Sequence, residues 1–157
     1  MTPQDAQETF DFQDGNGPVP AHKHSNGGGW VADTATVAET AYVGPDALIY
    51  DRAKVYGYAL IYDRARVSGR ATVYGDASVS GNAWVFGNAR VYVYAAVYGD
   101  AWVYGDAEVS GSASVSGNAS VSGRASVSGN AWVHGDAWVK GDAQVRGNAR
   151  VEEGAVR

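Results

Sequence analysis

A six-residue repeat without insertions is the feature that most limits how this chain can fold. Counted in steps of six, the residues from Val31 to Val151 are all Val or Ile, and those from Ala35 to Ala155 are all Ala. The unit reads Ala-x-Val-x-Gly-Asp/Asn, as in residues 101–106. In a strand, Ala and Val two residues apart point to one side, and the residues that flank Val point to the other. Each hexapeptide therefore predicts a short strand with a small apolar inner side, followed by a Gly-Asp or Gly-Asn corner.

The unbroken register over residues 30–156 resembles the hexapeptide-repeat, left-handed parallel β-helix family. Three hexapeptides form one triangular coil in that family. Positions 31 to 151, counted in steps of six, give 21 repeats and therefore imply seven coils of 18 residues. The period alone predicts only a parallel solenoid, and the left-handed sense comes from the resemblance. One departure is that the family commonly has a small residue directly after the aliphatic one, whereas this chain often has Tyr or Ser there. We expect an all-β, triangular β-helix over residues 30–157.

Residues 1–29 differ from the repeats and are expected to form a flexible N-terminal arm or a cap on the first coil. They are polar, hold three of the 4 prolines and end in a glycine-rich stretch, residues 27–29, which we interpret as a hinge. A basic start and an apolar run are both missing, so a signal peptide is not expected. Residues 22–45 also resemble the opening of uncharacterised hexapeptide proteins of phages and prophages. This second resemblance implies a phage or bacterial protein that works in the cytoplasm.

Composition excludes several classes of function. The chain has no cysteine, which removes disulfides, thiolate metal sites and a cysteine nucleophile. No stretch approaches the roughly 20 apolar residues that a membrane-spanning helix needs. Of the 17 acidic and 12 basic residues, four acids and one base precede Trp30, so the repeat region is nearly neutral. We therefore expect neither membrane insertion nor DNA binding by bulk charge.

Stacking in register should align residues 18 apart into columns on three outer faces. The first face carries most of the tryptophans, and a contiguous aromatic group is expected on the fourth and fifth coils. Exposed aromatic groups of this kind usually mark an interface, although they can also simply stabilise neighbouring coils. The candidate interface residues are Trp30, Trp84, Phe86, Trp102, Tyr104 and Trp138. Because the resembling family forms trimers of parallel prisms, a homotrimer is the expected assembly.

The second face predicts a partner or ligand site of tyrosines beside basic residues. The candidate residues are Tyr56, Tyr58, Tyr74, Arg90, Tyr92, Tyr94, Arg52, Lys54, Arg66 and Arg70, of which Arg66 lies on the first face. Tyr58 and Tyr94 stand at corners where Asn or Asp is usual, so we expect strained left-handed backbone there. A tyrosine platform beside arginines could hold a nucleotide or another small anion by stacking and charge. Solvated, salt-bridged corners are the alternative interpretation.

The third face is the weakest in aromatic residues. Between Ser110 and Ser128 every outward strand position on all three faces is serine, which could admit another backbone or could reflect duplication of a simple repeat. The regular threonine ladders of ice-binding helices are missing, so ice binding is not expected.

Catalysis is weighed because many hexapeptide proteins are acyltransferases or carbonic anhydrases. The resemblance implies, for acyl transfer, a histidine base and loops that project from the coils, whereas this array has no projecting loop and only His134 in its body. The carbonic-anhydrase type needs three histidines around zinc, and His22 with His24 lies in the arm. Catalytic residues, metal ions and cofactors are therefore not expected.

These observations predict a non-enzymatic, rigid β-helix that binds or assembles through its outward aromatic faces. One version of this function is sequestration of a host defence protein or of a nucleotide signal by a phage protein. An acyltransferase-like enzyme with a site between subunits near His134 is the first alternative, and a structural element of a virion is the second.

Overall fold

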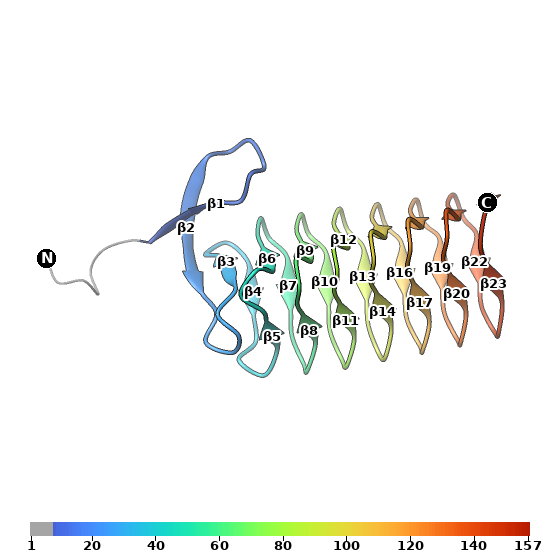
Figure 1. Ribbon diagram of the computed structural model, residues 1–157, viewed down its shortest axis with the longest axis horizontal. Coiled ribbons are helices and arrows are strands. Elements are labelled where there is room, and N and C mark those ends of the chain that lie inside the picture. Colours follow the sequence, from blue (N-terminus) through green and yellow to red (C-terminus); the bar gives the residue numbers. More distant parts are fainter. Residues whose placement is uncertain (1–7) are drawn as a thin grey trace, which may run out of the picture.

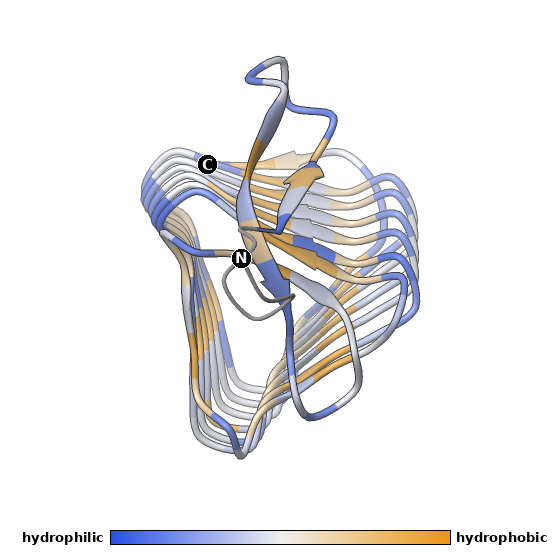
Figure 2. Cartoon of the chain, turned by 90° about the vertical axis from the view of Figure 1, so that its left-hand side faces the viewer, coloured by the Kyte–Doolittle hydropathy of each residue, from blue (hydrophilic) through white to orange (hydrophobic). Residues whose placement is uncertain are grey.

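The computed structural model describes residues 8–157, which form three parallel β-sheets wound as the sides of a triangular prism (Figures 1 and 2). Successive strands go to the three sheets in turn, so neighbours within one sheet are 18 residues apart, as in the pairing of Trp84 with Trp102. No helix occurs in the described part of the chain. The predicted parallel β-helix of about seven triangular coils is confirmed, with seven strands in each of the second and third sheets.

The strands are short and nearly all two residues long. The first sheet contains β1 (Thr9–Asp11), β2 (Pro18–Lys23), β3 (Trp30–Ala32), β6 (Leu48–Ile49), β9 (Arg66–Val67), β12 (Trp84–Val85), β15 (Trp102–Val103), β18 (Ser120–Val121), β21 (Trp138–Val139) and β24 (Ala155–Val156). The second contains β4 (Thr36–Val37), β7 (Lys54–Val55), β10 (Thr72–Val73), β13 (Arg90–Val91), β16 (Glu108–Val109), β19 (Ser126–Val127) and β22 (Gln144–Val145). The third contains β5 (Tyr42–Val43), β8 (Leu60–Ile61), β11 (Ser78–Val79), β14 (Ala96–Val97), β17 (Ser114–Val115), β20 (Trp132–Val133) and β23 (Arg150–Val151).

The interior is filled by the two six-residue series. Their alanines and aliphatic residues are buried from Ala41 to Val145 and form one continuous core. Each buried Val contributes about 1.5–3 kcal/mol, so stability accumulates coil by coil. Backbone hydrogen bonds run along the prism from coil to coil, as where the Trp84 N–H donates to the Ala101 carbonyl at 3.0 Å.

The corners explain the repeated glycine. Gly87 has a φ of 67°, and a Cβ added there would lie 2.8 Å from the backbone nitrogen of Gly105 in the next coil. Most corners therefore require a residue that tolerates positive φ and that has no side chain pointing along the stack. Asp51, Asp63 and Val93 occupy such corners with positive φ, and the two aspartates each accept a hydrogen bond from a backbone N–H of the following coil.

Residues 8–29 add an antiparallel β-hairpin to the first sheet. Strand β1 pairs with β2, and β2 pairs with β3 of the first coil. The hairpin lies at the N-terminal end of the prism and projects beyond the triangle (Figure 2). Gly27 and Gly29 pack against the backbone of residues 43–44, where an added Cβ would lie 2.2 and 2.3 Å from carbonyl oxygens. These glycines thus permit a close backbone approach, which differs from the hinge suggested by their sequence.

The end of the seventh coil departs from the repeat by one residue. Ala155 pairs with the outward Trp138, and Val156 pairs with Val139, so the offset here is 17 residues. The shift begins after Val151, because the Asp136 N–H donates to the Glu152 carbonyl at 3.1 Å. The inward alanine series therefore does not extend to Ala155, which is exposed.

Candidate functional site

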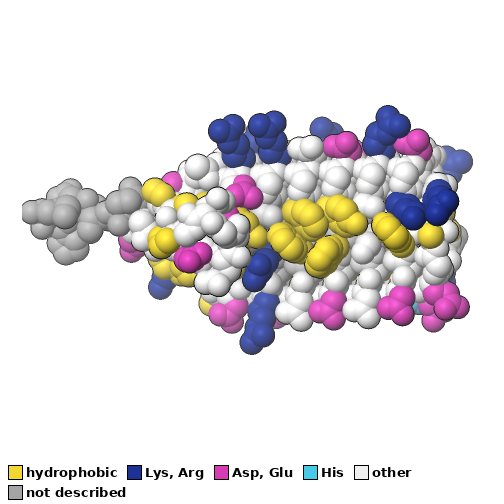
Figure 3. Space-filling view, turned by 90° about the horizontal axis from the view of Figure 1, so that it is seen from above, with side chains coloured by type: hydrophobic (Ala, Val, Ile, Leu, Met, Phe, Trp, Pro, Cys, Tyr) yellow, Lys and Arg dark blue, Asp and Glu magenta, His cyan; other side chains and the backbone are white. Residues whose placement is uncertain are grey.

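The first sheet brings four of the six candidate interface residues into one aromatic cluster. We call Trp84, Phe86, Trp102 and Tyr104 the aromatic block. Phe86 stacks on Tyr104 with ring centroids 4.9 Å apart, and Trp84 lies 4.4 Å from Phe86. Trp102 meets Trp84 edge to face at 5.6 Å. Figure 3 shows this cluster as a yellow group over the middle of the face, with charged side chains along both edges.

Trp102 lacks an indole hydrogen bond that three other tryptophans make. The indole Nε1–H of Trp84 donates to the hydroxyl of Ser68, 16 residues earlier, at 2.9 Å. Trp132 and Trp138 do the same to Ser116 and Ser122 at 3.2 Å. The residue 16 positions before Trp102 is Phe86, whose side chain has no atom that can accept a hydrogen bond from the indole N–H. Trp102 is 44% exposed and is the most exposed ring of the aromatic block.

The other two candidate interface residues lie apart from the block. Trp30 is partly covered by the hairpin, because Phe10 stacks on it at 4.8 Å and the Lys23 ammonium lies 5.6 Å from its ring. Part of the ring is therefore used in a hairpin contact that the repeat does not predict, and its place in an interface stays a prediction. Trp138 is exposed near the other end of the sheet, with the Lys140 ammonium 3.8 Å from its ring.

Two serines of the serine-rich region form hydrogen bonds with tryptophan side chains. Ser116 and Ser122 accept the indole bonds of Trp132 and Trp138 and are buried. These two serines are thus covered by the chain itself, so this part of the serine-rich region between residues 110 and 128 is not open to another backbone.

The second sheet carries a ladder of three stacked tyrosines. We call Tyr56, Tyr74 and Tyr92 the tyrosine ladder, whose rings are nearly parallel with centroids 4.9 and 5.0 Å apart. Burial of the central ring raises the pKa of Tyr74 above its usual value, and the neighbouring tyrosines add to this effect. The central tyrosine therefore stays in its neutral, hydrogen-bonding form at physiological pH.

The backbone strain predicted at Tyr58 and Tyr94 lies one residue earlier. The positive φ values belong to Gly57 and Val93, at 70° and 62°. Gly57 adopts this conformation without strain, whereas Val93 is β-branched and does not. The expectation for the tyrosines is therefore wrong, because the left-handed position of each corner is its first residue. Tyr58 and Tyr94 are nevertheless the two most exposed large hydrophobic residues among those described.

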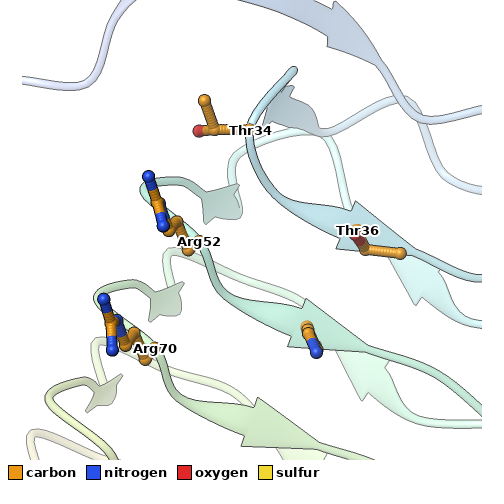
Figure 4. A pocket seen from close by; sticks show the side chains of 5 residues that line it. Thr34, Thr36, Arg52 and Arg70 are labelled. Carbon is orange, nitrogen blue, oxygen red and sulfur yellow. The ribbon is translucent and has the colours of Figure 1, made fainter.

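Three of the candidate basic residues meet at an open groove. The groove has a volume of about 550 Å³ and is lined by Thr34, Thr36, Arg52, Lys54 and Arg70. Figure 4 shows Thr34, Arg52 and Arg70 at equivalent corners of successive coils, with Thr36 on the neighbouring strand. Nothing in the sequence singled out the two threonines, although their 18-residue spacing from Arg52 and Lys54 places them in the same columns.

The remaining basic candidates lie outside this groove. The Arg66 guanidinium lies 5.9 Å from the Trp84 ring and so belongs to the edge of the aromatic block. Arg90 lies on the second sheet and forms an ion pair with Glu108 at 3.7 Å. The basic residues selected from the sequence are thus divided among the groove, the edge of the aromatic block and an ion pair on the second sheet.

The histidines have structural partners. The His134 ring packs on Trp132 with centroids 4.1 Å apart. His24 is buried, and its Nε2–H donates to the Ala41 carbonyl at 2.8 Å, while His22 Nδ1 lies 2.7 Å from Asp33. Within residues 8–157 no group of three or more His, Asp or Glu side chains could hold a metal ion.

Comparison with known proteins identifies the repeat. The family described as the YdcK beta solenoid repeat matches residues 65–81. Searches of curated proteins and of solved structures found no match. Among residues 8–157 there is also no helix of the length and apolarity needed to cross a membrane. The matched repeat and the three-sided coil together make this chain a β-solenoid repeat protein, as the hexapeptide pattern predicts.

Proposed function

We propose that this β-solenoid repeat protein is a non-enzymatic assembly protein that binds a second copy of itself through the first sheet. The observation that carries the proposal is the aromatic block, in which Trp102 projects with 44% of its surface exposed. Large aromatic side chains can each bury about 150–250 Å², and tryptophan and tyrosine are enriched where proteins associate.

The arrangement of the first face supports this use. The strip between Trp84 and Tyr104 carries no charge, whereas charged side chains lie along its two edges (Figure 3). An apolar centre with a polar rim is the usual anatomy of a protein interface.

A second copy is the partner that fits this strip best. The strands of this face repeat with each coil, and the aromatic block occupies two successive coils, with Phe86 and Tyr104 4.9 Å apart. A second prism presents strands at the same spacing, so the two blocks can pack together over these two coils. The trimer implied by the hexapeptide resemblance is one such arrangement, with three parallel prisms around a common axis.

Light scattering after size-exclusion chromatography tests the proposal. The native protein should have a mass that is a multiple of the 16.4 kDa chain, and the multiple gives the number of subunits. Trp102→Ser should shift the protein toward monomer at micromolar concentration. Trp132→Ser is the matched control, because it removes an outward tryptophan from the third sheet, and it should leave the assembly intact.

Two results would contradict the proposal. One is a native protein that is monomeric at micromolar concentration. The other is an equal loss of assembly in Trp102→Ser and Trp132→Ser, because loss of any outward tryptophan would then be sufficient to disrupt the oligomer.

A further inference from the structure

The tyrosine ladder ends on an open ring face. Tyr74 is stacked on both sides, but Tyr56 is stacked only on Tyr74. The register that pairs Thr36 with Lys54 and Val37 with Val55 places Ala38 at the rung beyond Tyr56. Because Ala38 has only a methyl group, this rung lacks a ring, and Tyr56 is 43% exposed. A planar aromatic group could therefore continue the stack above Ala38.

The empty rung lies directly beside the basic groove. Thr36 lines the groove, and Ala38 follows it by two residues, directly after strand β4. Lys54 has the same relation to Tyr56 on strand β7. Residues two apart along a strand are about 6.6 Å from each other. A ligand whose ring stacks on Tyr56 and carries an anionic group could thus place that group in the groove.

The groove supplies cations that the protein itself leaves unpaired. In the part of the chain that the structure describes, Arg52, Lys54 and Arg70 form no ion pair with a carboxylate. Asp51 lies at the same corner as Arg52, but its carboxylate accepts the Gly69 N–H at 3.0 Å. Three unpaired cations with two threonine hydroxyls favour a phosphate, which accepts several charge-assisted hydrogen bonds.

The two ends of the ladder differ in charge, which gives the site a direction. Beyond Tyr92 the next rung is Ser110, which Glu108 precedes by two residues as Thr36 precedes Ala38. Arg90, the counterpart of Lys54 beside Tyr92, forms an ion pair with Glu108 at 3.7 Å. A carboxylate beside that end repels an anion. At the Tyr56 end the exposed Glu39 follows Ala38, on the side away from the groove, so the anionic group is directed toward Lys54.

We propose that Tyr56, Ala38 and the groove of Arg52, Lys54 and Arg70 form a binding site for a nucleoside phosphate, with the base stacked on Tyr56 and the phosphate in the groove. The site lies on the second sheet and at its corner with the first sheet, and it uses no residue of the aromatic block. Base–aromatic stacking and a basic groove together are a common means of holding nucleotides without a deep pocket.

Titration with AMP, followed by NMR of the tyrosine ring signals, tests the site. AMP should shift the Tyr56 signals in a saturable way, whereas adenosine and inorganic phosphate should each bind at least about tenfold more weakly. Ala38→Tyr should abolish binding, because the new ring fills the empty rung. Ser110→Tyr is the matched control, since it extends the ladder at its other end and should leave AMP binding unchanged.

The basic groove is tested separately with Lys54→Gln and Arg52→Gln, each of which should weaken AMP binding by about fivefold or more. Arg124→Gln is the control, because Arg124 occupies the same corner column but pairs with Asp142 at 2.9 Å. The proposal is overturned if AMP gives no saturable shift of Tyr56, or if Ala38→Tyr binds AMP as the native protein does. Equal binding of AMP and of adenosine or inorganic phosphate would also overturn it.

Discussion

Val93 is the residue whose backbone fits the repeat least well. It occupies a corner column that holds Gly57, Gly75 and Gly111 in neighbouring coils, and it adopts the same positive φ, 62°. Asp51 and Asp63 also have positive φ, but each is compensated because its carboxylate accepts a hydrogen bond from a backbone N–H. Valine has no such group, and a β-branched residue in this region costs about 1–3 kcal/mol.

Replacing Val93 by glycine should stabilise the protein. We expect Val93→Gly to raise the free energy of unfolding by about 1 kcal/mol, because relief of strain exceeds the entropy that glycine adds to the unfolded chain. Urea denaturation measures this difference. Asp51→Gly is the control and should give no gain, because it removes the hydrogen bond to Gly69. A loss of stability in Val93→Gly would show that the valine side chain makes a contact worth more than the strain.

At the scale of elements, the hairpin is held to the prism mainly by aromatic packing. Phe12 is 1% exposed and stacks on Tyr50 of the second coil with ring centroids 5.0 Å apart. Phe10 reaches Trp30 of the first coil in the same way. The hairpin therefore covers the start of the first sheet through two aromatic contacts and one strand pairing, β2 with β3.

Removing the buried ring should release the hairpin without unfolding the coils. Phe12→Ala is expected to cost about 3–5 kcal/mol of packing energy, as for other buried phenylalanines. Hydrogen exchange should then become fast in strands β1 and β2 and remain slow in strands such as β12. Phe10→Ala, which truncates a less buried ring, should have a smaller effect. Equal acceleration in the hairpin and in the central coils would show that the chain unfolds as one unit.

The elements also show which features could be predicted from sequence. The repeat predicts the three sheets, the buried series and the columns, so the contact of Trp84 with Trp102 follows from their 18-residue spacing. The hairpin could not be predicted, because β1 and β2 lie outside the repeat. For the same reason the covering of Trp30 by Phe10 was missed. The shift at Ala155 depends on the backbone path through Glu152, which the six-residue pattern does not encode.

The candidate site was predicted in its parts but not in its arrangement. Nine residues of the second face and its corners were selected by residue type together with Arg66 of the first face, and the structure distributes the basic ones among a groove, the aromatic block and an ion pair with Glu108. The place of each residue in its coil decides this distribution, since Arg66 lies on strand β9 of the first sheet beside Trp84, while Arg52 and Arg70 lie at corners that line the groove. The missing ring at Ala38 follows from the register, but the conclusion that a ligand could stack there depends on the observed stacking of Tyr56 on Tyr74.

At the scale of the whole molecule, each coil contacts only the coils next to it. Val97 on strand β14 pairs with Val115 on β17, whereas Val43 and Val133 of the same sheet are five coils apart, about 24 Å at about 4.8 Å per coil. Energetic coupling between two core sites should therefore decrease sharply with the number of coils between them. This one-dimensional organisation distinguishes the prism from a globular core, in which a single substitution affects neighbours from many parts of the chain.

Double substitutions in the core test this organisation. Each of Val43→Ala, Val97→Ala, Val115→Ala and Val133→Ala should destabilise the protein by roughly 1–3 kcal/mol. The distant pair at Val43 and Val133 should be additive within about 0.5 kcal/mol, whereas the stacked pair at Val97 and Val115 should depart from additivity by more than this. Urea denaturation of the single and double variants gives both coupling energies. Strong coupling between Val43 and Val133 would contradict a nearest-neighbour core and would mean that strain is transmitted along the whole prism.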